Sequence, residues 1–182
     1  MRVIGTVGLP GSGKGEAAAV ARDLGIPVIT MGDVIRRECR DRGLDPADHH
    51  GEVARALREE DGPLAVADRS LPLIEEALEE SERVLVDGLR SSAEVERFEE
   101  AFGEEFLLVA VEAPFEVREK RIGVRGRDDA DAEPLEARDE RELGFGMGEA
   151  IDRADVHIEN AGTLERFRER VRTVLTGEAI ER

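Results

Sequence analysis

Five short apolar segments are spaced along the chain, and each has the length and composition of a β-strand. They cover residues 3–7, 27–29, 84–86, 106–111 and 156–158. The first, third and fourth are almost continuously apolar, which is typical of strands that helices cover on both faces of a sheet. Segments with helical periodicity separate them, so the pattern predicts an α/β fold with a doubly wound parallel sheet.

The predicted helices include two longer excursions. The stretch 33–80 is too long for a simple crossover between strands, so we expect a small helical insert there. The stretch 126–146 is charged at its start and ends in closely spaced glycines, which indicates a lid. No repeat, linker or low-complexity segment divides the 182 residues, so we expect one domain over 1–182.

The first predicted strand runs into a glycine-rich segment that an alanine-rich helical pattern follows. The spacing Gly8-x-x-x-x-Gly13-Lys14 is that of a phosphate-binding loop, in which Lys14 reaches the β- and γ-phosphates. Its glycines allow backbone N–H groups to point inward, and the following helix attracts anions to its N-terminus. A plain glycine-rich turn with a surface lysine is the alternative, but the strand-to-helix context favours phosphate binding. The residues assigned to ATP are Gly8, Pro10, Gly11, Ser12, Gly13, Lys14, Gly15 and Glu16.

One position of this loop departs from the common pattern. Gly15 stands where a Ser or Thr hydroxyl usually touches Mg²⁺, and Glu16 follows it. The metal must then be held largely through water or by carboxylates elsewhere. Asp87 ends the third predicted strand, where it can orient Mg²⁺ or its waters beside the loop. An Asp that merely caps the turn is the alternative, but Ser91 or Ser92 can cap the next helix.

Charged residues follow the second, third and fourth strands, and α/β sheets bind ligands at the carboxyl ends of their strands. Asp33 and Arg36 share one helix face, so they can accept a hydroxyl and clamp an anion; an exposed ion pair is the alternative. Arg90 is expected to point into the same cleft as a phosphate clamp. Arg121 and Arg125 lie one helical turn apart, and paired guanidinium groups suit transferring phosphates.

Composition limits the other possibilities. The net charge is −17, and only two of the 26 basic residues are lysines, Lys14 and Lys120. This balance resembles that of proteins from extreme halophiles, whose charge repulsion is screened at molar salt; an ordinary acidic protein is the alternative. An acidic chain is a poor nonspecific ligand for nucleic acid. We interpret Arg118 and Lys120 as surface residues that balance nearby acids at 128, 129 and 131.

Compartment and partners are constrained by what the chain does not contain. Cys39 is the only cysteine, which excludes an internal disulfide and a Cys-based zinc site. No apolar stretch has the length of a membrane span, and the N-terminus does not read as a signal peptide. We therefore expect a cytoplasmic protein with no membrane partner. The sequence leaves the oligomeric state open.

The order of the motifs resembles that of adenylate-kinase-type nucleoside monophosphate kinases. The shared motifs are Gly-x-Pro-Gly-Ser-Gly-Lys-Gly, Gly32-Asp33-x-x-Arg36, Asp87-Gly88-x-Arg90 and Arg121-x-x-x-Arg125. The ending Ala154-Asp155-Val-His-Ile158-Glu-Asn160-Ala-Gly162-Thr163-Leu resembles dephospho-coenzyme A kinases. Together the motifs resemble an archaeal family of P-loop proteins related to dephospho-coenzyme A kinases.

This resemblance implies a P-loop NTPase with a five-stranded sheet of order 2-3-1-4-5, an acceptor-binding insert at about 33–80 and a short lid at about 126–146. It implies that Arg36 and Arg90 hold the acceptor phosphate. Arg121 would then lie against the donor base, and Arg125 on the donor phosphates. Asn160 and Gly162 would border the adenine.

The activity that the resemblance implies is phosphoryl transfer from Mg·ATP to a small molecule of the nucleoside monophosphate or dephospho-coenzyme A type. Lys14, Asp33, Asp87 and Arg125 are the expected catalytic residues, and Asp33 can accept a proton if the acceptor is a hydroxyl. A nucleotide-dependent binding or regulatory protein with slow ATPase activity is the alternative, which the missing hydroxyl at Gly15 favours.

Overall fold

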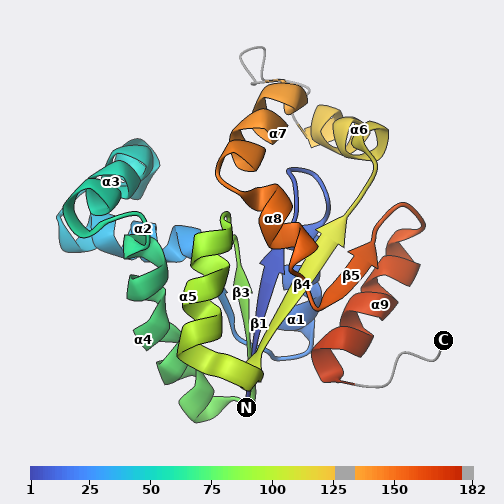
Figure 1. The fold of residues 1–182 in the computed structure, drawn as a ribbon, viewed down its shortest axis with the longest axis horizontal. Helices are drawn as coiled ribbons and strands as arrows, with labels where there is room; N and C mark the ends of the chain where they lie inside the picture. The colour runs from blue at the N-terminus through green and yellow to red at the C-terminus, as the bar shows by residue number, and fades with distance from the viewer. Residues whose placement is uncertain (126–133, 178–182) are drawn as a thin grey trace.

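Five parallel strands form the central sheet of this computed structural model, which describes residues 1–125 and 134–177, with the backbone alone at 124 and 125. Their order is β2-β3-β1-β4-β5 (Figure 1). The strands are β1 (Arg2–Val7), β2 (Val28–Thr30), β3 (Arg83–Asp87), β4 (Phe106–Glu112) and β5 (Val156–Glu159). The predicted strands and their predicted order are confirmed, and each predicted end lies within one residue of the observed one.

Helices cover both faces of the sheet, as the nearly continuous apolar strands predicted. On one face, α1 and α9 pack over a core that contains Ile4, Leu85 and Val111. On the other, α4, α5 and α8 pack over a core built on Val3, Val86 and other strand residues (Figure 1). The helices are α1 (Lys14–Asp23), α2 (Met31–Asp41), α3 (Pro46–Asp61), α4 (Ala65–Glu80), α5 (Ser92–Phe102), α6 (Phe115–Arg125), α7 (Leu135–Gly144), α8 (Met147–Asp152) and α9 (Leu164–Thr176), with a 3₁₀ turn η1 (Gly103–Glu105).

The parallel register brings the carboxyl ends of the central strands to one edge of the sheet. Thr6 of β1 lies opposite Asp87 of β3, and Val7 lies opposite Ala110 of β4. The loops that leave these strands therefore start side by side. Helices α6 and α7 lie above this same edge (Figure 1).

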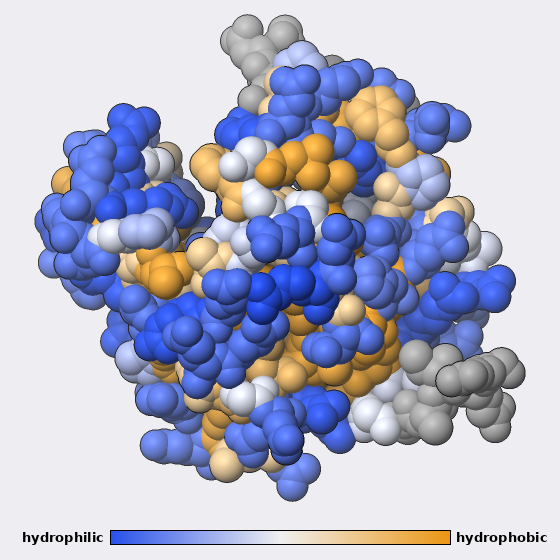
Figure 2. All heavy atoms as spheres, in the orientation of Figure 1, coloured by the Kyte–Doolittle hydropathy of each residue, from blue (hydrophilic) through white to orange (hydrophobic). Residues whose placement is uncertain are grey.

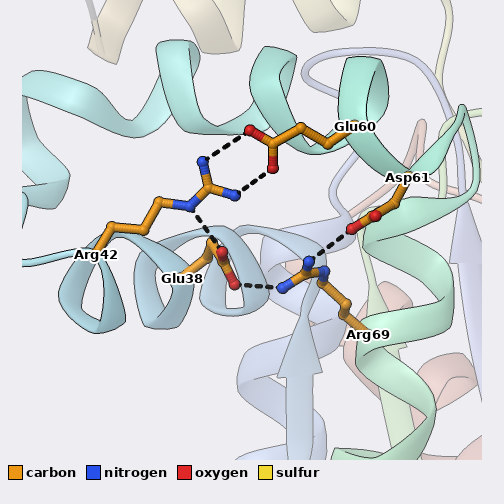
Figure 3. Close-up of polar contacts among 5 residues, drawn as sticks. All are labelled: Glu38, Arg42, Glu60, Asp61 and Arg69. Atoms are coloured by element: carbon orange, nitrogen blue, oxygen red, sulfur yellow. Dashed lines mark hydrogen bonds and ion pairs between the residues drawn. The ribbon is translucent and has the colours of Figure 1, made fainter.

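Helices α2, α3 and α4 occupy the predicted insert and are tied together by a network of ion pairs (Figure 3). Glu38 of α2 accepts hydrogen bonds from Arg42 at 2.7 Å and from Arg69 of α4 at 2.5 Å. Arg42 also reaches Glu60 of α3 at 2.7 Å, and Arg69 reaches Asp61 at 2.7 Å. Isolated surface pairs contribute little, but a shared network restrains all three helices at once.

The insert and the lid segment stand on opposite sides of an open groove. Figure 2 shows a largely hydrophilic surface and a gap between the lobe of α2 and α3 and the part that carries α7. Residues 134–146 of the predicted lid form α7 and the turn into α8, whereas 126–133 lie outside the described residues. Within the described ranges, no helix has both the length and the apolar content that a bilayer span requires.

Candidate functional site

The loop between β1 and α1 has a backbone that only glycine adopts easily. Gly8, Gly11 and Gly13 have φ values of 150°, 79° and 119°. A Cβ atom at Gly8 would lie 2.2 Å from the backbone oxygen of Val111, and one at Gly13 would lie 2.3 Å from Asn160 Nδ2. The loop therefore combines left-handed backbone with close packing, and side chains at these positions would displace it.

The inside of the loop has the properties of an anion site. Helix α1 begins at Lys14, and the N–H groups of a first helical turn have no partner within the helix. The hydroxyl of Ser12 is buried and has no hydrogen-bond partner among the described residues. A phosphate oxygen would satisfy such donors, so the loop fits the phosphate group that its sequence predicts.

Lys14 is folded back onto this loop. Its ammonium group donates hydrogen bonds to the backbone oxygens of Gly8 and Leu9. Burial lowers the pKa of Lys14 below its usual value, although the carboxylates of Asp87 and Glu142 act in the opposite direction. A cation held in a desolvated pocket gains from a bound anion, because the anion replaces the lost solvation.

A cleft of about 690 Å³ opens beside the loop, large enough for a nucleotide-sized ligand. It brings together most of the predicted donor-site residues, and Asp87, from four distant parts of the chain. The residues that line it are Gly11, Gly13, Lys14, Gly15, Glu16, Asp87, Lys120, Arg121, Asn160, Gly162 and Leu164. The sequence interpretation missed two of these, Lys120 and Leu164. One feature of the sequence could have drawn attention to Lys120, because it is one of only two lysines in the chain.

Arg121 and Asn160 brace the loop from the cleft wall. The Nδ2 group of Asn160 donates to the backbone oxygen of Ser12 at 2.8 Å. Arg121 donates to the backbone oxygen of Asn160 at 2.9 Å and to its side-chain oxygen at 3.1 Å. These contacts join α6 and the β5–α9 turn to the phosphate loop. The side chain of Arg125, the other arginine predicted here, lies outside the described residues.

Asp87 lies at the carboxyl end of β3, where the sequence predicted it. Thr6 Oγ1 donates to its Oδ1 atom at 2.9 Å, which fixes the carboxylate at the edge of the cleft. No group of three or more His, Cys, Asp or Glu side chains gathers as a metal site in the described parts of the chain. A magnesium ion would thus need phosphate oxygens and water besides Asp87, which suits an ion that arrives with a nucleotide.

The two residues after Lys14 have different surroundings. A Cβ atom at Gly15 would meet no atom within 4 Å, so the absence of a hydroxyl there is not imposed by crowding. Glu16 accepts a hydrogen bond from Arg168 of α9 at 2.5 Å. Its carboxylate therefore already has a partner outside the loop.

We expect Asp87→Asn to raise the Mg²⁺ concentration needed for half-maximal turnover far more than Glu16→Gln does. Both carboxylates line the cleft, but the charge of Glu16 is already paired with Arg168, whereas Asp87 accepts a hydrogen bond from the neutral hydroxyl of Thr6. Magnesium titrations of ATP turnover in both variants measure this. A larger effect of Glu16→Gln would mean that Glu16, and not Asp87, positions the metal ion.

On the predicted acceptor side, a carboxylate oxygen of Asp33 lies 2.6 Å from the guanidinium group of Arg36. The two residues therefore form an ion pair, which was the alternative to a role in binding the acceptor. Asp33 also completes a capping box with Thr30 at the start of α2. Partial burial acts to raise the pKa of Asp33, but hydrogen bonds from Thr30 and Arg36 outweigh it and hold the pKa below its usual value. A carboxylate held in this way is a weak proton acceptor. Neither residue lines the 690 Å³ cleft.

Arg90 follows β3, three positions after Asp87, and its positive charge acts to lower the pKa of Lys14. The backbone N–H of Arg90 donates to the buried Glu94 at 2.8 Å, and Ser91 caps α5. Its guanidinium group donates to Glu142 of α7 at 3.3 Å. Glu142, which the sequence interpretation overlooked, thus joins the lid segment to the predicted acceptor region.

The interpretation of Arg118 as a surface residue is wrong. Arg118 is buried and forms a bidentate ion pair with Asp139 of α7, with hydrogen bonds of 2.8 and 2.7 Å. It also donates to the backbone oxygens of Pro10 and Ala113, each at 3.1 Å. Its partner lies 21 positions along the chain, in a segment whose helix position the sequence did not fix. Arg118 therefore links α7 to the phosphate loop.

A parallel 2-3-1-4-5 sheet whose first strand enters this loop defines a P-loop NTPase fold, of the kind that small-molecule kinases use. Residues 7–136 match the family profile described as an AAA domain. The chain belongs to the UPF0200 family. It is 60% identical to a UPF0200 protein of Halobacterium salinarum over 179 residues, which cover 98% of this chain and 94% of that one. A UPF0200 protein of Methanosarcina mazei is 52% identical over 97% of this chain and 95% of its own.

Solved structures share the fold at lower identity. TT1252 from Thermus thermophilus superposes with a TM-score of 0.65, at 24% identity and 98% coverage of both chains. Shikimate kinase from Acinetobacter baumannii, in complex with shikimate, has a TM-score of 0.59 at 18% identity, covering 100% of this chain and 96% of its own. A gluconokinase from Sinorhizobium meliloti has a TM-score of 0.57 at 18% identity, over 97% of this chain and 92% of its own. At these identities the likeness establishes the fold alone.

Proposed function

We propose that this protein is an ATP-dependent phosphotransferase that acts on a nucleotide-like small molecule of the nucleoside monophosphate or dephospho-coenzyme A type. The observation that carries the proposal is the cleft beside the phosphate loop, together with two arginines that follow the neighbouring strands at the same edge of the sheet. Arg36 lies on α2, which begins after β2, and Arg90 lies three positions after Asp87 at the end of β3. A protein that only hydrolyses ATP needs no second charged site. The shikimate kinase and the gluconokinase that share this fold support the same class of reaction.

In this proposal the chain mainly positions its substrates and stabilises charge. The loop N–H groups and Lys14 hold the donor phosphates, while Arg121 and the Asn160–Gly162 turn border the base. Asp87 and water would hold Mg²⁺, which supplies further neutralisation of the β- and γ-phosphates when it is bound. The groove between the insert and α7 admits the acceptor (Figure 2).

A coupled assay of ADP release tests the proposal. The protein is supplied with Mg·ATP and a panel of nucleoside monophosphates and dephospho-coenzyme A. Because the chain carries a net charge of −17, the assay is run in about 3 M KCl, where the Debye length is only a few ångströms. Stimulation of ADP release by one acceptor, with a phosphorylated product, is the expected result.

We expect Arg36→Ala and Arg90→Ala to impair acceptor use while ATP binding stays nearly unchanged. Loss of a charge-assisted contact costs about 1.5–3 kcal/mol, which is roughly ten- to hundredfold in acceptor affinity. Titrations of ATP and of the best acceptor measure the two effects separately. Arg40→Ala, an exposed change on the same helix as Arg36, is the matched control.

The second candidate function is a regulatory or binding protein with slow ATPase activity. The observation that favours it is Gly15, which leaves the usual metal-binding hydroxyl out of the loop although space for one is open. The regulatory function would be supported if no acceptor stimulates ADP release and if Arg36→Ala and Arg90→Ala hydrolyse ATP like the unaltered protein.

A further inference from the structure

Glu16 places a carboxylate in the wall of the cleft that runs beside the phosphate loop. It lies in the first turn of α1, two positions after Lys14, and it is one of the residues that line the 690 Å³ cleft. The positive end of a helix attracts either a carboxylate or a phosphate. An unpaired Glu16 would therefore compete with, and repel, the phosphate groups that the loop fits.

A cation of α9 lies against this carboxylate. The Nε group of Arg168 donates a hydrogen bond to a carboxylate oxygen of Glu16 at 2.5 Å. The side chain of Glu16 is 24% exposed and that of Arg168 is 51% exposed, so the carboxylate is the more buried partner. Arg168 does not line the cleft itself but lines a neighbouring groove over α9. We therefore expect it to act on a bound ligand through Glu16.

The ion pair is not what holds the two helices together. Ala17 and Ala21 of α1 belong to the same apolar core as Phe167 and Val171 of α9. An ion pair as exposed as that of Arg168 contributes little to stability. Its main effect is expected on the electrostatic field inside the cleft.

We infer that Arg168 is a positioning residue of the donor site, which cancels the charge of Glu16 and so allows a nucleoside triphosphate to bind beside it. This inference rests on the nucleotide-binding part of the proposed function and adds a residue to it. The repulsion between two charges scales with their product. Loss of Arg168 should therefore weaken a ligand more strongly when the ligand carries more negative charge.

Titrations of ATP affinity, with no acceptor present, test the inference. They are run at the lowest KCl concentration at which thermal melting shows each variant folded, because salt screens the repulsion. For Arg168→Gln we expect about tenfold weaker binding of Mg·ATP and a larger loss for magnesium-free ATP, which carries more charge. Both losses should shrink in about 3 M KCl. Arg168→Lys keeps the charge and should recover part of the affinity.

The double variant Glu16→Gln/Arg168→Gln separates charge cancellation from other roles of Arg168. Without the carboxylate there is no charge to cancel, so the double variant should recover most of the affinity that Arg168→Gln loses. Equal losses in Arg168→Gln and in the double variant would mean that Arg168 contacts the nucleotide or only shapes the site. That result would overturn the inference, as would an unchanged affinity in Arg168→Gln.

Arg172→Gln is the matched control, because Arg172 is an exposed arginine one turn further along α9 in the same groove. It removes the same charge from the helix, and we expect ATP affinity to change little. A loss as large as that of Arg168→Gln would assign the effect to the net charge of α9 and overturn the inference while nucleotide binding stands. If the unaltered protein binds no ATP, the proposed function itself fails, and the inference with it.

Discussion

Lys14→Met is expected to reduce phosphotransfer by about 10²–10³-fold while the protein keeps its fold. The ammonium group is the side-chain cation placed inside the phosphate loop, where it contacts the Gly8 and Leu9 carbonyls. Folding removes water from this charge, and this desolvation lowers the pKa of Lys14. Methionine has a similar length and no charge, so the melting temperature should stay the same or rise as activity is lost. Turnover at saturating ATP and thermal melting measure the two effects.

Lys120→Met is the matched control, since Lys120 is the other lysine of the chain and lines the same cleft. Its side chain lies on the open wall of the cleft, outside the loop, so we expect a much smaller loss, within about tenfold. Full activity of Lys14→Met at saturating ATP would remove the phosphate loop from the reaction. Equal losses in the two variants would mean that the cleft needs positive charge in general and not a cation at Lys14.

The fold was predictable because its signals are local. Each strand is an apolar run that turn or helix signals end, and the glycine pattern after β1 has a fixed spacing. Capping was also local: Ser91 lies at the start of α5, where its hydroxyl accepts the N–H of Glu94. The sheet order came from the resemblance of the motifs, and the structure confirms it.

The candidate site was less predictable, because its side chains find partners over long sequence separations. Arg90 and Glu142 are 52 positions apart, and Glu16 and Arg168 are 152 positions apart. A charge pattern read along one helix cannot reveal such partners, so Arg118 was taken for a surface residue and Glu142 was overlooked. Asp33 shows the opposite case. Its pairing with Arg36 was one of the two alternatives that the spacing offered, whereas its bonds with Thr30 were not predicted. Hydrogen bonds from Thr30 and Arg36 together lower the pKa of Asp33.

Removal of one member of the buried Arg118–Asp139 pair is expected to cost about 3–5 kcal/mol of unfolding free energy. The side chains are only 5% and 14% exposed, so Arg118→Met or Asp139→Leu leaves a largely desolvated charge without its partner. The exposed pair of Arg97 and Asp68, at 30% and 48% exposure, is the control. Breaking that pair should cost at most about 1 kcal/mol. Denaturant titrations of the four single variants give the comparison.

The double variant Arg118→Met/Asp139→Leu separates the stability of the pair from its effect on the loop. Replacing both charges with apolar groups removes the unpaired charge, so stability should return to within about 1–2 kcal/mol of the unaltered protein. The double variant still lacks the donor that Arg118 gives to the Pro10 carbonyl, 108 positions away. We therefore expect its ATP affinity to stay about tenfold weaker, the size of one lost charge-assisted hydrogen bond. Recovery of stability and ATP affinity together would mean that Arg118 matters only for packing α7. Recovery of stability alone would mean that α7 and the phosphate loop are coupled through this one guanidinium group.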